Sequence, residues 1–325
     1  MLIPSKAGLS ASELPHNAVT TFARGNMYST PLSLTTDTHF ELPSFLHEAG
    51  ADNPWSHANL GGRDIHSFLD GPCFDGSGNL WLTDAPFGRI FRITPTGEWD
   101  LITKYDGWPS GLTFHADGRL FIADQRHGIL QFDVSLRKLA PVLTHYVGQR
   151  FLGVSHLTFA SNGDLYFSDA GQTGFHAADG ALYRMKANGE LQRLVGNIPR
   201  PSGLSLNAGE DLLLMGVAGD NAVWRVPLVE GGVSKVSRYL QLSGGWGANA
   251  GPGGIVTDSD DNVYVAHQGL GCVWMFDKRG EPKYRIDSSR GDTITGITID
   301  PNDPRTVLVT EAQTGVVLKA SLPMY

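Results

Sequence analysis

The sequence predicts an all-β fold, a six-bladed β-propeller formed by a single domain. One sequence pattern occurs six times along the chain, with copies that start at residues 70, 110, 155, 202, 253 and 295. Successive starts are therefore 40 to 51 residues apart, which is the length of one four-stranded propeller blade. The chain also contains 40 glycines and 18 prolines, which suits many short strands joined by turns.

Each copy of the pattern predicts a two-stranded hairpin. The copies are 70–84, 110–124, 155–169, 202–216, 253–267 and 295–311, and the sixth is two residues longer than the others. In each of them an apolar stretch leads into a turn rich in aspartate, asparagine or glycine, and a second apolar stretch follows. These turn residues cap the backbone or accept positive φ angles, as a hairpin requires.

The segments between the copies supply the outer strands of the blades. A third strand is predicted at 89–95, 128–134, 181–187, 222–228, 272–278 and 316–322, and a fourth is readable at 100–106, 140–146 and 237–243. The sixth copy has no fourth strand after it, so residues 38–46 (THFELPSFL) are expected to complete that blade and close the ring. This assigns residues 1–37 to an N-terminal extension and residues 38–325 to the propeller.

Composition and charge argue against several classes of protein. The formal net charge is −8 and the lysines and arginines are scattered, so we expect no nucleic-acid partner. No apolar run approaches the ~20 residues of a membrane-spanning helix, and the first 26 residues lack the apolar segment of a signal peptide. Only Cys73 and Cys272 are present, so we expect no disulfide scaffold and a cytoplasmic protein. No heptads or other assembly signature predict an oligomeric state.

Hairpin geometry predicts the face of the ring that carries the site. The first residue of each copy (the opener) lies beside the last residue (the closer), and the innermost strands line the central channel. The openers are Asp70, Ser110, Ser155, Ser202, Gly253 and Thr295. The closers are Asp84, Asp124, Asp169, Gly216, His267 and Glu311. Loops next to the copies are expected to form the pocket walls, with candidate substrate-binding residues Trp108, His127, Arg150 and Trp246.

Several phrases resemble the family of gluconolactonases, senescence marker protein and luciferin-regenerating enzyme. They are DGPCFDGSGNLW (70–81), PSGL (109–112 and 201–204), GDLYFSDA (163–170) and GGIVTDSDDNVYVAHQG (253–269). The resemblance covers roughly residues 66–323. It implies a six-bladed propeller and, for most members, a metal-dependent lactonase or related ester hydrolase with a small-molecule substrate.

The resemblance also implies a divalent cation at the channel mouth, held by oxygens from opener positions. Carried over by position, the family's ligands fall on Asp70, Ser155, Ser202 and Gly253, and only Asp70 keeps a carboxylate. A hard cation such as Ca²⁺ prefers about six to eight oxygen ligands that include carboxylates. A divalent cation at Asp70 and a metal-free site are therefore both open.

Asp70 and His156 are the leading candidates for catalysis. Asp70 either starts a strand or serves as a general base or metal ligand, and it is the only acidic opener. His156 stands one residue after an opener, where the other five copies have glycine. Imidazole titrates near neutral pH, so His156 is either a proton-transfer group or a satisfied structural residue.

His267 is a third catalytic candidate, and the alternative is a structural hydrogen bond to a neighbouring loop. Together Asp70, His156 and His267 would offer a carboxylate and two imidazoles, a set that suits Zn²⁺, although their local spacing resembles no zinc motif. The three aspartate closers, being equivalent copies, are expected to cap their own blades.

Three serine openers are predicted to hydrogen-bond the substrate rather than to attack it. Ser110, Ser155 and Ser202 lie in WPSGL, GVSHL and RPSGL, none of which is a G-x-S-x-G elbow. Adjacent side chains on a strand face opposite ways, so Ser155 is not expected to meet His156.

The stretch 53–68 precedes the first copy and is rich in tryptophan, histidine and glycine. It is expected to form a lid over the channel mouth, a self-association element or a surface wrap.

Three functions follow from this pattern. The first is a lactonase-like hydrolase that acts on a small cyclic ester or related carbonyl compound. The second is a metal-independent acid–base enzyme, an isomerase, lyase, condensing enzyme or carbon–carbon bond-cleaving enzyme, that uses Asp70 and His156. The third is a ligand-binding propeller without catalysis.

Overall fold

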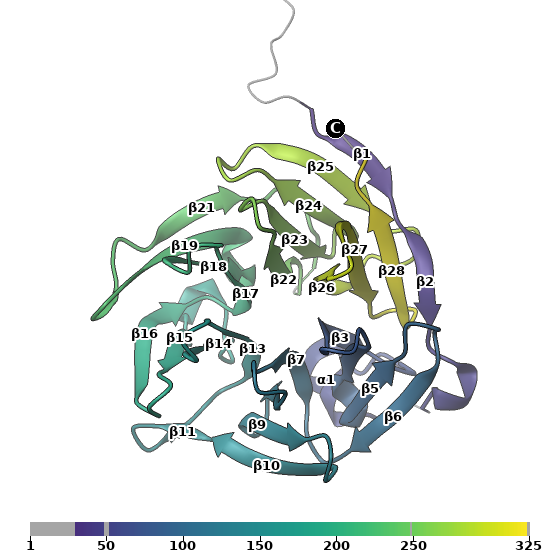
Figure 1. Cartoon of the computed structure of the whole chain (residues 1–325), viewed down its shortest axis with the longest axis horizontal. Helices are drawn as coiled ribbons and strands as arrows, with labels where there is room; N and C mark the ends of the chain where they lie inside the picture. The colour runs from purple at the N-terminus through teal and green to yellow at the C-terminus, as the bar shows by residue number, and fades with distance from the viewer. Residues whose placement is uncertain (1–29, 49–51, 248, 324–325) are drawn as a thin grey trace, which may run out of the picture.

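The computed structural model describes residues 30–48, 52–247 and 249–323 as a six-bladed β-propeller. Six four-stranded blades surround a central channel (Figure 1). Within each blade the strands are antiparallel, and the first strand in sequence lies innermost. The predicted fold class is confirmed, as are the six hairpins and the strands that follow them.

Blades 1 to 3 follow the chain in order. Blade 1 contains β3 (Leu69–Phe74), β4 (Leu80–Asp84), β5 (Arg89–Ile93) and β6 (Trp99–Lys104). Blade 2 contains β7 (Pro109–Phe114), β8 (Leu120–Asp124), β9 (Gly128–Asp133) and β10 (Lys138–Leu143). A short hairpin follows, formed by β11 (His145–Tyr146) and β12 (Gln149–Arg150). Blade 3 contains β13 (Val154–Phe159), β14 (Leu165–Asp169), β15 (Gly180–Met185) and β16 (Leu191–Ile198).

Blades 4 to 6 complete the ring. Blade 4 contains β17 (Pro201–Leu206), β18 (Leu212–Val217), β19 (Ala222–Val229) and β21 (Ser237–Gln241), with the short β20 (Gly232–Val233) paired to the end of β19. Blade 5 contains β22 (Gly251–Thr257), β23 (Val263–Gln268), β24 (Cys272–Phe276) and β25 (Pro282–Asp287). Blade 6 contains β26 (Ile294–Asp300), β27 (Asp303–Glu311), β28 (Val316–Ser321) and β2 (Asp37–Glu41).

The N-terminal strand β2 closes the ring by pairing antiparallel with β28 (Figure 1). The predicted closing strand is confirmed in position, but it is shorter than 38–46, because Pro43 interrupts it and residues Ser44–Leu46 form the 3-10 helix η1. A further strand, β1 (Leu32–Thr35), pairs parallel with β25 at the outer edge of blade 5. Residues 1–29 of the predicted extension lie outside the described residues.

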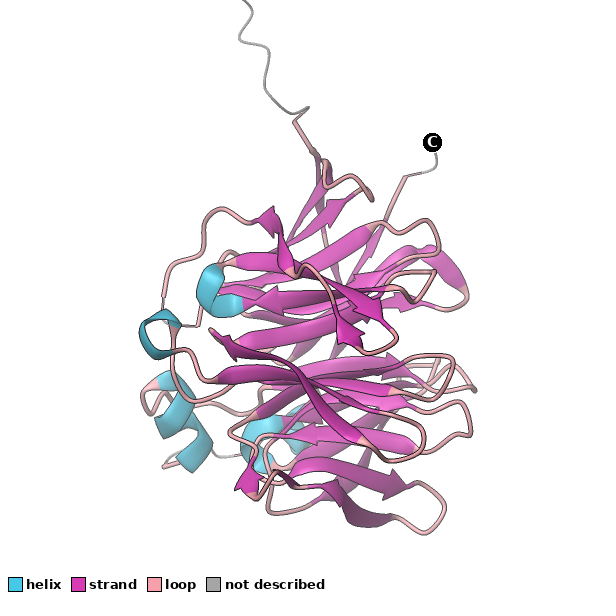
Figure 2. Cartoon of the chain, turned by 90° about the vertical axis from the view of Figure 1, so that its left-hand side faces the viewer, coloured by secondary structure: helices cyan, strands magenta, loops and turns pink. Residues whose placement is uncertain are grey.

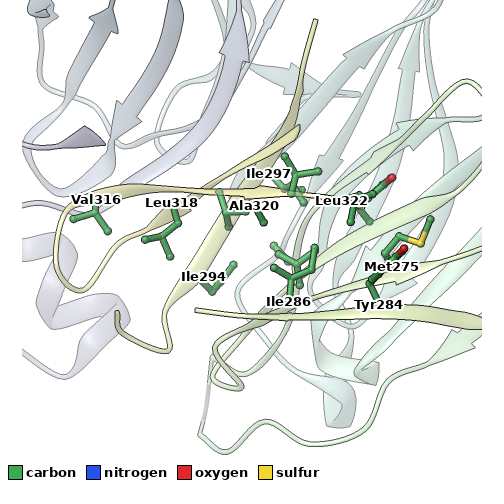
Figure 3. Close-up of a cluster of buried hydrophobic side chains, with 14 residues drawn as sticks. Met275, Tyr284, Ile286, Ile294, Ile297, Val316, Leu318, Ala320 and Leu322 are labelled. Atoms are coloured by element: carbon green, nitrogen blue, oxygen red, sulfur yellow. The ribbon is translucent and has the colours of Figure 1, made fainter. Parts of the chain in front are cut away.

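The core is divided among the blade interfaces. Six clusters of buried apolar side chains each lie between two neighbouring blades. In the cluster between blades 5 and 6, Tyr284 and Ile286 from β25 face Ile294 from β26 and Leu318 from β28 (Figure 3). Burial of these faces is the main force that holds the blades together.

The helical segments lie at one face of the ring (Figure 2). The helix α1 (Pro54–Leu60) begins where the Asn53 side chain accepts from the amides of Trp55 and Ser56, and it ends at Gly61 in the left-handed conformation. Short 3-10 turns follow three of the closers: η2 (Ala85–Phe87), η3 (Phe175–Ala177) and η4 (Ala218–Asp220). Within the described residues, no helix has the length and apolar character needed to cross a membrane.

The closer Asp84 is part of a buried ion pair that ties the N-terminal segment to blade 1. Asp84 accepts from Arg89 Nε at 2.7 Å and from the amide of Phe68 at 2.6 Å. Arg89 also donates to the carbonyl of Leu46, and both charged side chains are fully buried. The prediction that this aspartate caps its own blade is confirmed.

Replacing Arg89 with leucine should lower the free energy of unfolding by about 3–5 kcal/mol, because Asp84 would remain as an unpaired buried charge. Urea denaturation of the variant and the wild type measures the change. Arg279→Leu is the matched control, since Arg279 is largely exposed and its ion pairs should be worth less than ~0.5 kcal/mol. Equal losses in the two variants would contradict this role for Arg89.

Candidate functional site

A polar cavity of about 500 Å³ lies at the mouth of the channel, on the face that carries α1. We call it the inner cavity. Its floor is formed by opener residues and its walls by the loops next to the repeats. The residues from the openers are Asp70, Ser110, Ser155, Ser202, Gly253 and Thr295. All six openers therefore line the same cavity, as the hairpin geometry predicts.

A β-bulge in the first hairpin of each blade turns the openers toward this cavity. In blade 3 the pairing passes from Val154–Asp169 directly to His156–Ser168, so Ser155 is the extra residue. The other five blades also carry one extra residue at this point. A bulge bends the strand and re-aims the side chains beside it.

This bulge overturns the expectation that Ser155 would not meet His156. Ser155 Oγ lies 2.9 Å from His156 Nδ1, and both residues line the inner cavity. The alternation of side chains assumed from the sequence holds for a regular strand and fails at a bulge.

Asp70 and His156 reach the inner cavity from blades 1 and 3. Asp70 is 8 % exposed, and its Oδ2 accepts from Ser110 Oγ at 2.8 Å. Within the described part of the chain, Asp70 Oδ1 and His156 Nε2 are both buried without a hydrogen-bond partner. Unsatisfied buried polar atoms are rare in folded proteins, and two of them on residues that line one cavity mark this cavity as the candidate site.

Burial lowers the pKa of His156 below the ordinary value for histidine, and the negative charge of Asp70 opposes this shift by raising the pKa. Desolvation is the larger effect because it disfavours the imidazolium ion. Burial therefore favours the neutral imidazole, which has one ring nitrogen able to accept a proton.

The helix α1 covers part of the cavity mouth. Trp55 is buried, and its Nε1 donates to Gln125 Oε1 at 3.3 Å. The carbonyl of Asn59 accepts from Asn249 Nδ2 at 2.6 Å, which joins the helix to the loop before blade 5. The stretch 53–68 thus contributes to the cavity wall, and its role as a lid stays a prediction.

A second, outer cavity of about 860 Å³ adjoins the first and shares Asn59, Leu60 and Asn249 with it. The predicted residue Trp246 lies at its edge and is 96 % exposed. Trp246 lines only the outer cavity, whereas Asp70 and His156 line only the inner one.

Four of the predicted side chains lie elsewhere or point away from the inner cavity. His267 is fully buried, accepts from Trp274 Nε1 at 3.2 Å, and is absent from the cavity lining. Arg150 is exposed on β12, and His127 Nε2 lies 2.6 Å from the carbonyl oxygen of Asp106. Ser202 lines the cavity, but its hydroxyl donates to the carbonyl of Pro252 at 2.7 Å. Trp108 does line the cavity, beneath the guanidinium of Arg126.

The donors at the family's metal-ligand positions do not fit a hard divalent cation. Asp70 supplies the one carboxylate, the Ser155 hydroxyl is engaged with His156, and the Ser202 hydroxyl is engaged with a neighbouring blade. Gly253 has no side chain to offer, whereas Ca²⁺ takes six to eight oxygens. The zinc set of Asp70, His156 and His267 is not assembled, since no three such side chains gather at metal-binding distance among the described residues.

Sequence reasoning missed Arg200 and Asn249, which line the wall of the inner cavity. Arg200 stands two residues before an opener, at the position that Trp108 occupies in blade 2. The correspondence between these two positions is the signal that could have found it. Asn249 lies in an irregular glycine-rich loop and carries no such signal.

The fold and the cavity are those of a six-bladed propeller with a polar pocket at one end of its channel. The chain belongs to the family described as the SMP-30/Gluconolactonase/LRE-like region, whose model matches residues 61–313.

Named relatives support this membership. Lactonase drp35 from Staphylococcus saprophyticus is 27 % identical over 249 residues, which are 74 % of each chain. A gluconolactonase from Xanthomonas campestris superposes with a TM-score of 0.70 at 18 % identity, over 88 % of this chain and 99 % of that one. A calcium-binding regucalcin from Agrobacterium tumefaciens gives 0.67 at 20 % identity, over 78 % and 89 %. At these identities the two structures establish the shared fold.

Replacing His267 with asparagine should flatten the dependence of stability on pH. Burial, followed by the charge of Arg285, lowers the pKa of His267 to about 4, whereas an unfolded histidine titrates near 6.5. Between these values the unfolded chain binds a proton that the folded chain rejects, so acid destabilises the fold. The contribution is present above pH 6.5 and is lost as pH falls toward 4.

Urea unfolding at pH 7.5 and pH 4.5 tests this expectation. The wild type should lose about 2–3 kcal/mol more than His267→Asn over this interval. Asparagine keeps an acceptor for Trp274 and carries no titrating ring. Equal losses in the two proteins would show that His267 does not control the acid stability.

Proposed function

We propose that this protein is a metal-independent hydrolase that opens a small cyclic ester in the inner cavity, with Asp70 and His156 as its acid–base pair. The observation that carries the proposal is that Asp70 and His156 line one cavity, while Asp70 Oδ1 and His156 Nε2 are buried without hydrogen-bond partners among the described residues. The relative named as a lactonase supports the choice of ester chemistry.

In the proposed reaction His156 serves as the general base. With the proton on Nδ1 and donated to Ser155 Oγ, Nε2 keeps a lone pair that can accept a proton. Nε2 accepts a proton from water as the water oxygen attacks the ester carbonyl carbon. The ring carbon–oxygen bond then breaks, and the imidazolium returns the proton to the leaving alkoxide.

Asp70 stabilises the imidazolium that forms during this cycle. Its negative charge favours the protonated form of His156, which is the direction in which it shifts the pKa of that residue. Ser110 and Ser155 are positioning residues, because their hydroxyls hold Asp70 and His156 in place. Neither step requires a metal ion, in agreement with the donor set at the opener positions.

A second candidate is an isomerase or lyase that uses the same pair to abstract a proton next to a carbonyl group. The two unpartnered atoms favour it equally, since they imply proton transfer and do not specify the bond that breaks. Turnover in D₂O distinguishes the two candidates. Isomerisation introduces deuterium at carbon and elimination leaves a new double bond, whereas ester hydrolysis leaves every carbon–hydrogen bond intact.

Asp70→Asn and His156→Asn should each lower kcat for lactone hydrolysis by about 10²- to 10⁴-fold, because the first removes the charge that stabilises the imidazolium and the second removes the general base. A pH-stat assay over a panel of γ- and δ-lactones measures the rate. His115→Asn is the control, because His115 lies in a hairpin turn and packs against Phe159 outside the cavity. Wild-type rates in both site variants would contradict the assignment of the pair.

The wild-type rate should also survive dialysis against EDTA. The reason is that Asp70 supplies the only carboxylate at the positions where the family holds its cation. Loss of activity on dialysis, with recovery on addition of Ca²⁺ or Zn²⁺, would overturn the metal-independent mechanism.

A further inference from the structure

Arg200 has an unusual backbone conformation at the wall of the inner cavity. Its φ angle is +56°, in the left-handed region, although it precedes a proline and has a long side chain. The neighbouring loop enforces this conformation, because the carbonyls of Pro199 and Arg200 accept from the amides of Gly219 and Ala218. Strain that is held in place by packing is frequent at ligand sites.

The side chain of Arg200 gives the inner cavity its positive charge. It is half-buried, and its Nη2 donates to Asn249 Oδ1 at 3.4 Å. Of the described residues that line this cavity, Arg200 is the only lysine or arginine and Asp70 is the only carboxylic acid. Burial lowers the pKa of Arg200. The ordinary pKa of arginine is so high that the guanidinium still stays charged at neutral pH.

The two charges lie on opposite sides of the channel. Asp70 belongs to β3 in blade 1, and Arg200 immediately precedes β17 in blade 4, three blades away in a ring of six (Figure 1). A negative group held by Arg200 would therefore lie away from the carboxylate of Asp70. The space between them would contain the rest of the bound molecule.

We propose that the substrate is an anion, a cyclic ester that carries a carboxylate group, and that Arg200 binds this carboxylate while the ester ring faces Asp70 and His156. This inference rests on the proposed function and names its substrate class. One guanidinium pairs with a carboxylate through two parallel hydrogen bonds. A phosphate would bring nearly two negative charges into a cavity with a single fixed cation.

A purely structural role for Arg200 is the competing explanation. The contacts from Arg200 to Asn249 and from Asn249 to the carbonyl of Asn59 link blade 4, the loop before blade 5 and α1. If Arg200 only held this link, then removal of Asn249 would have the same effect as removal of Arg200. Asn249→Ala is therefore the matched control.

Isothermal titration calorimetry with a pair of non-hydrolysable rings tests the proposal. The probes are tetrahydrofuran-2-carboxylate and the neutral tetrahydrofuran-2-carboxamide, which have nearly the same shape. The wild type should bind the carboxylate at least about tenfold more tightly, the scale of a charge-assisted hydrogen bond. This preference should disappear in Arg200→Gln, persist in part in Arg200→Lys, and persist in Asn249→Ala.

Three results would overturn the proposal. The first is equal binding of the two probes by the wild type, and the second is loss of the preference in Asn249→Ala to the same extent as in Arg200→Gln. The third is tighter binding of tetrahydrofurfuryl phosphate than of the carboxylate by the wild type. The probes are not hydrolysed, so the outcome is independent of the hydrolase assay. A carboxylate preference without lactone turnover would refute the proposed function alone. Lactone turnover without the preference would refute this inference alone.

Discussion

The close approach of neighbouring backbones around the channel is the constraint on which the site depends. One residue after each opener, the innermost strand packs directly against the next blade, and five of these positions are glycine. A Cβ atom at Gly71 would lie 2.2 Å from the carbonyl oxygen of Ser110, and one at Gly203 would lie 2.4 Å from that of Gly253. Blade 3 differs from the other five because it carries His156, a large side chain, at this position.

This packing explains both the small size of the inner cavity and its chemistry. Because the inner strands meet backbone to backbone, short side chains line the channel mouth, Asp70 is buried and His156 is half-buried. An unpartnered buried polar atom costs the fold about 1–3 kcal/mol. Six apolar clusters between the blades offset this cost, and a ligand that hydrogen-bonds to Asp70 Oδ1 and His156 Nε2 would recover it.

Much of the fold was predictable from the sequence because each blade repeats the same local pattern. The hairpins, the closing strand and the face that carries Asp70 follow from the repeat and from ring closure. The parallel strand β1 was not predicted, since four residues paired at an outer edge leave no periodic signal. The hydrogen bonds of the aspartate closers were predicted, because three copies at equivalent positions indicate a structural role.

The site was less predictable, because it depends on departures from the repeat. The contact between Ser155 and His156 requires a bulge, which residue alternation does not reveal. Arg200 reaches the cavity through a left-handed backbone, which its flanking prolines would not suggest. His267 and His127 have the same side chain as His156, so the sequence did not separate the three. The burial of His267 beside Trp274 and the contact of His127 with the carbonyl of Asp106 became visible only in the folded chain.

The central claim is that His156 and Asp70 form one electrostatically coupled pair in a buried cavity. The most direct measurement is an NMR titration of the ¹⁵N-labelled imidazole of His156 in the wild type and in Asp70→Asn. The pKa of His156 should lie below the ordinary value of about 6.5 and should fall further in Asp70→Asn, because the carboxylate that favours the imidazolium is removed. A pKa near 6.5 that does not change in the variant would contradict the coupling, and with it the proposed acid–base pair.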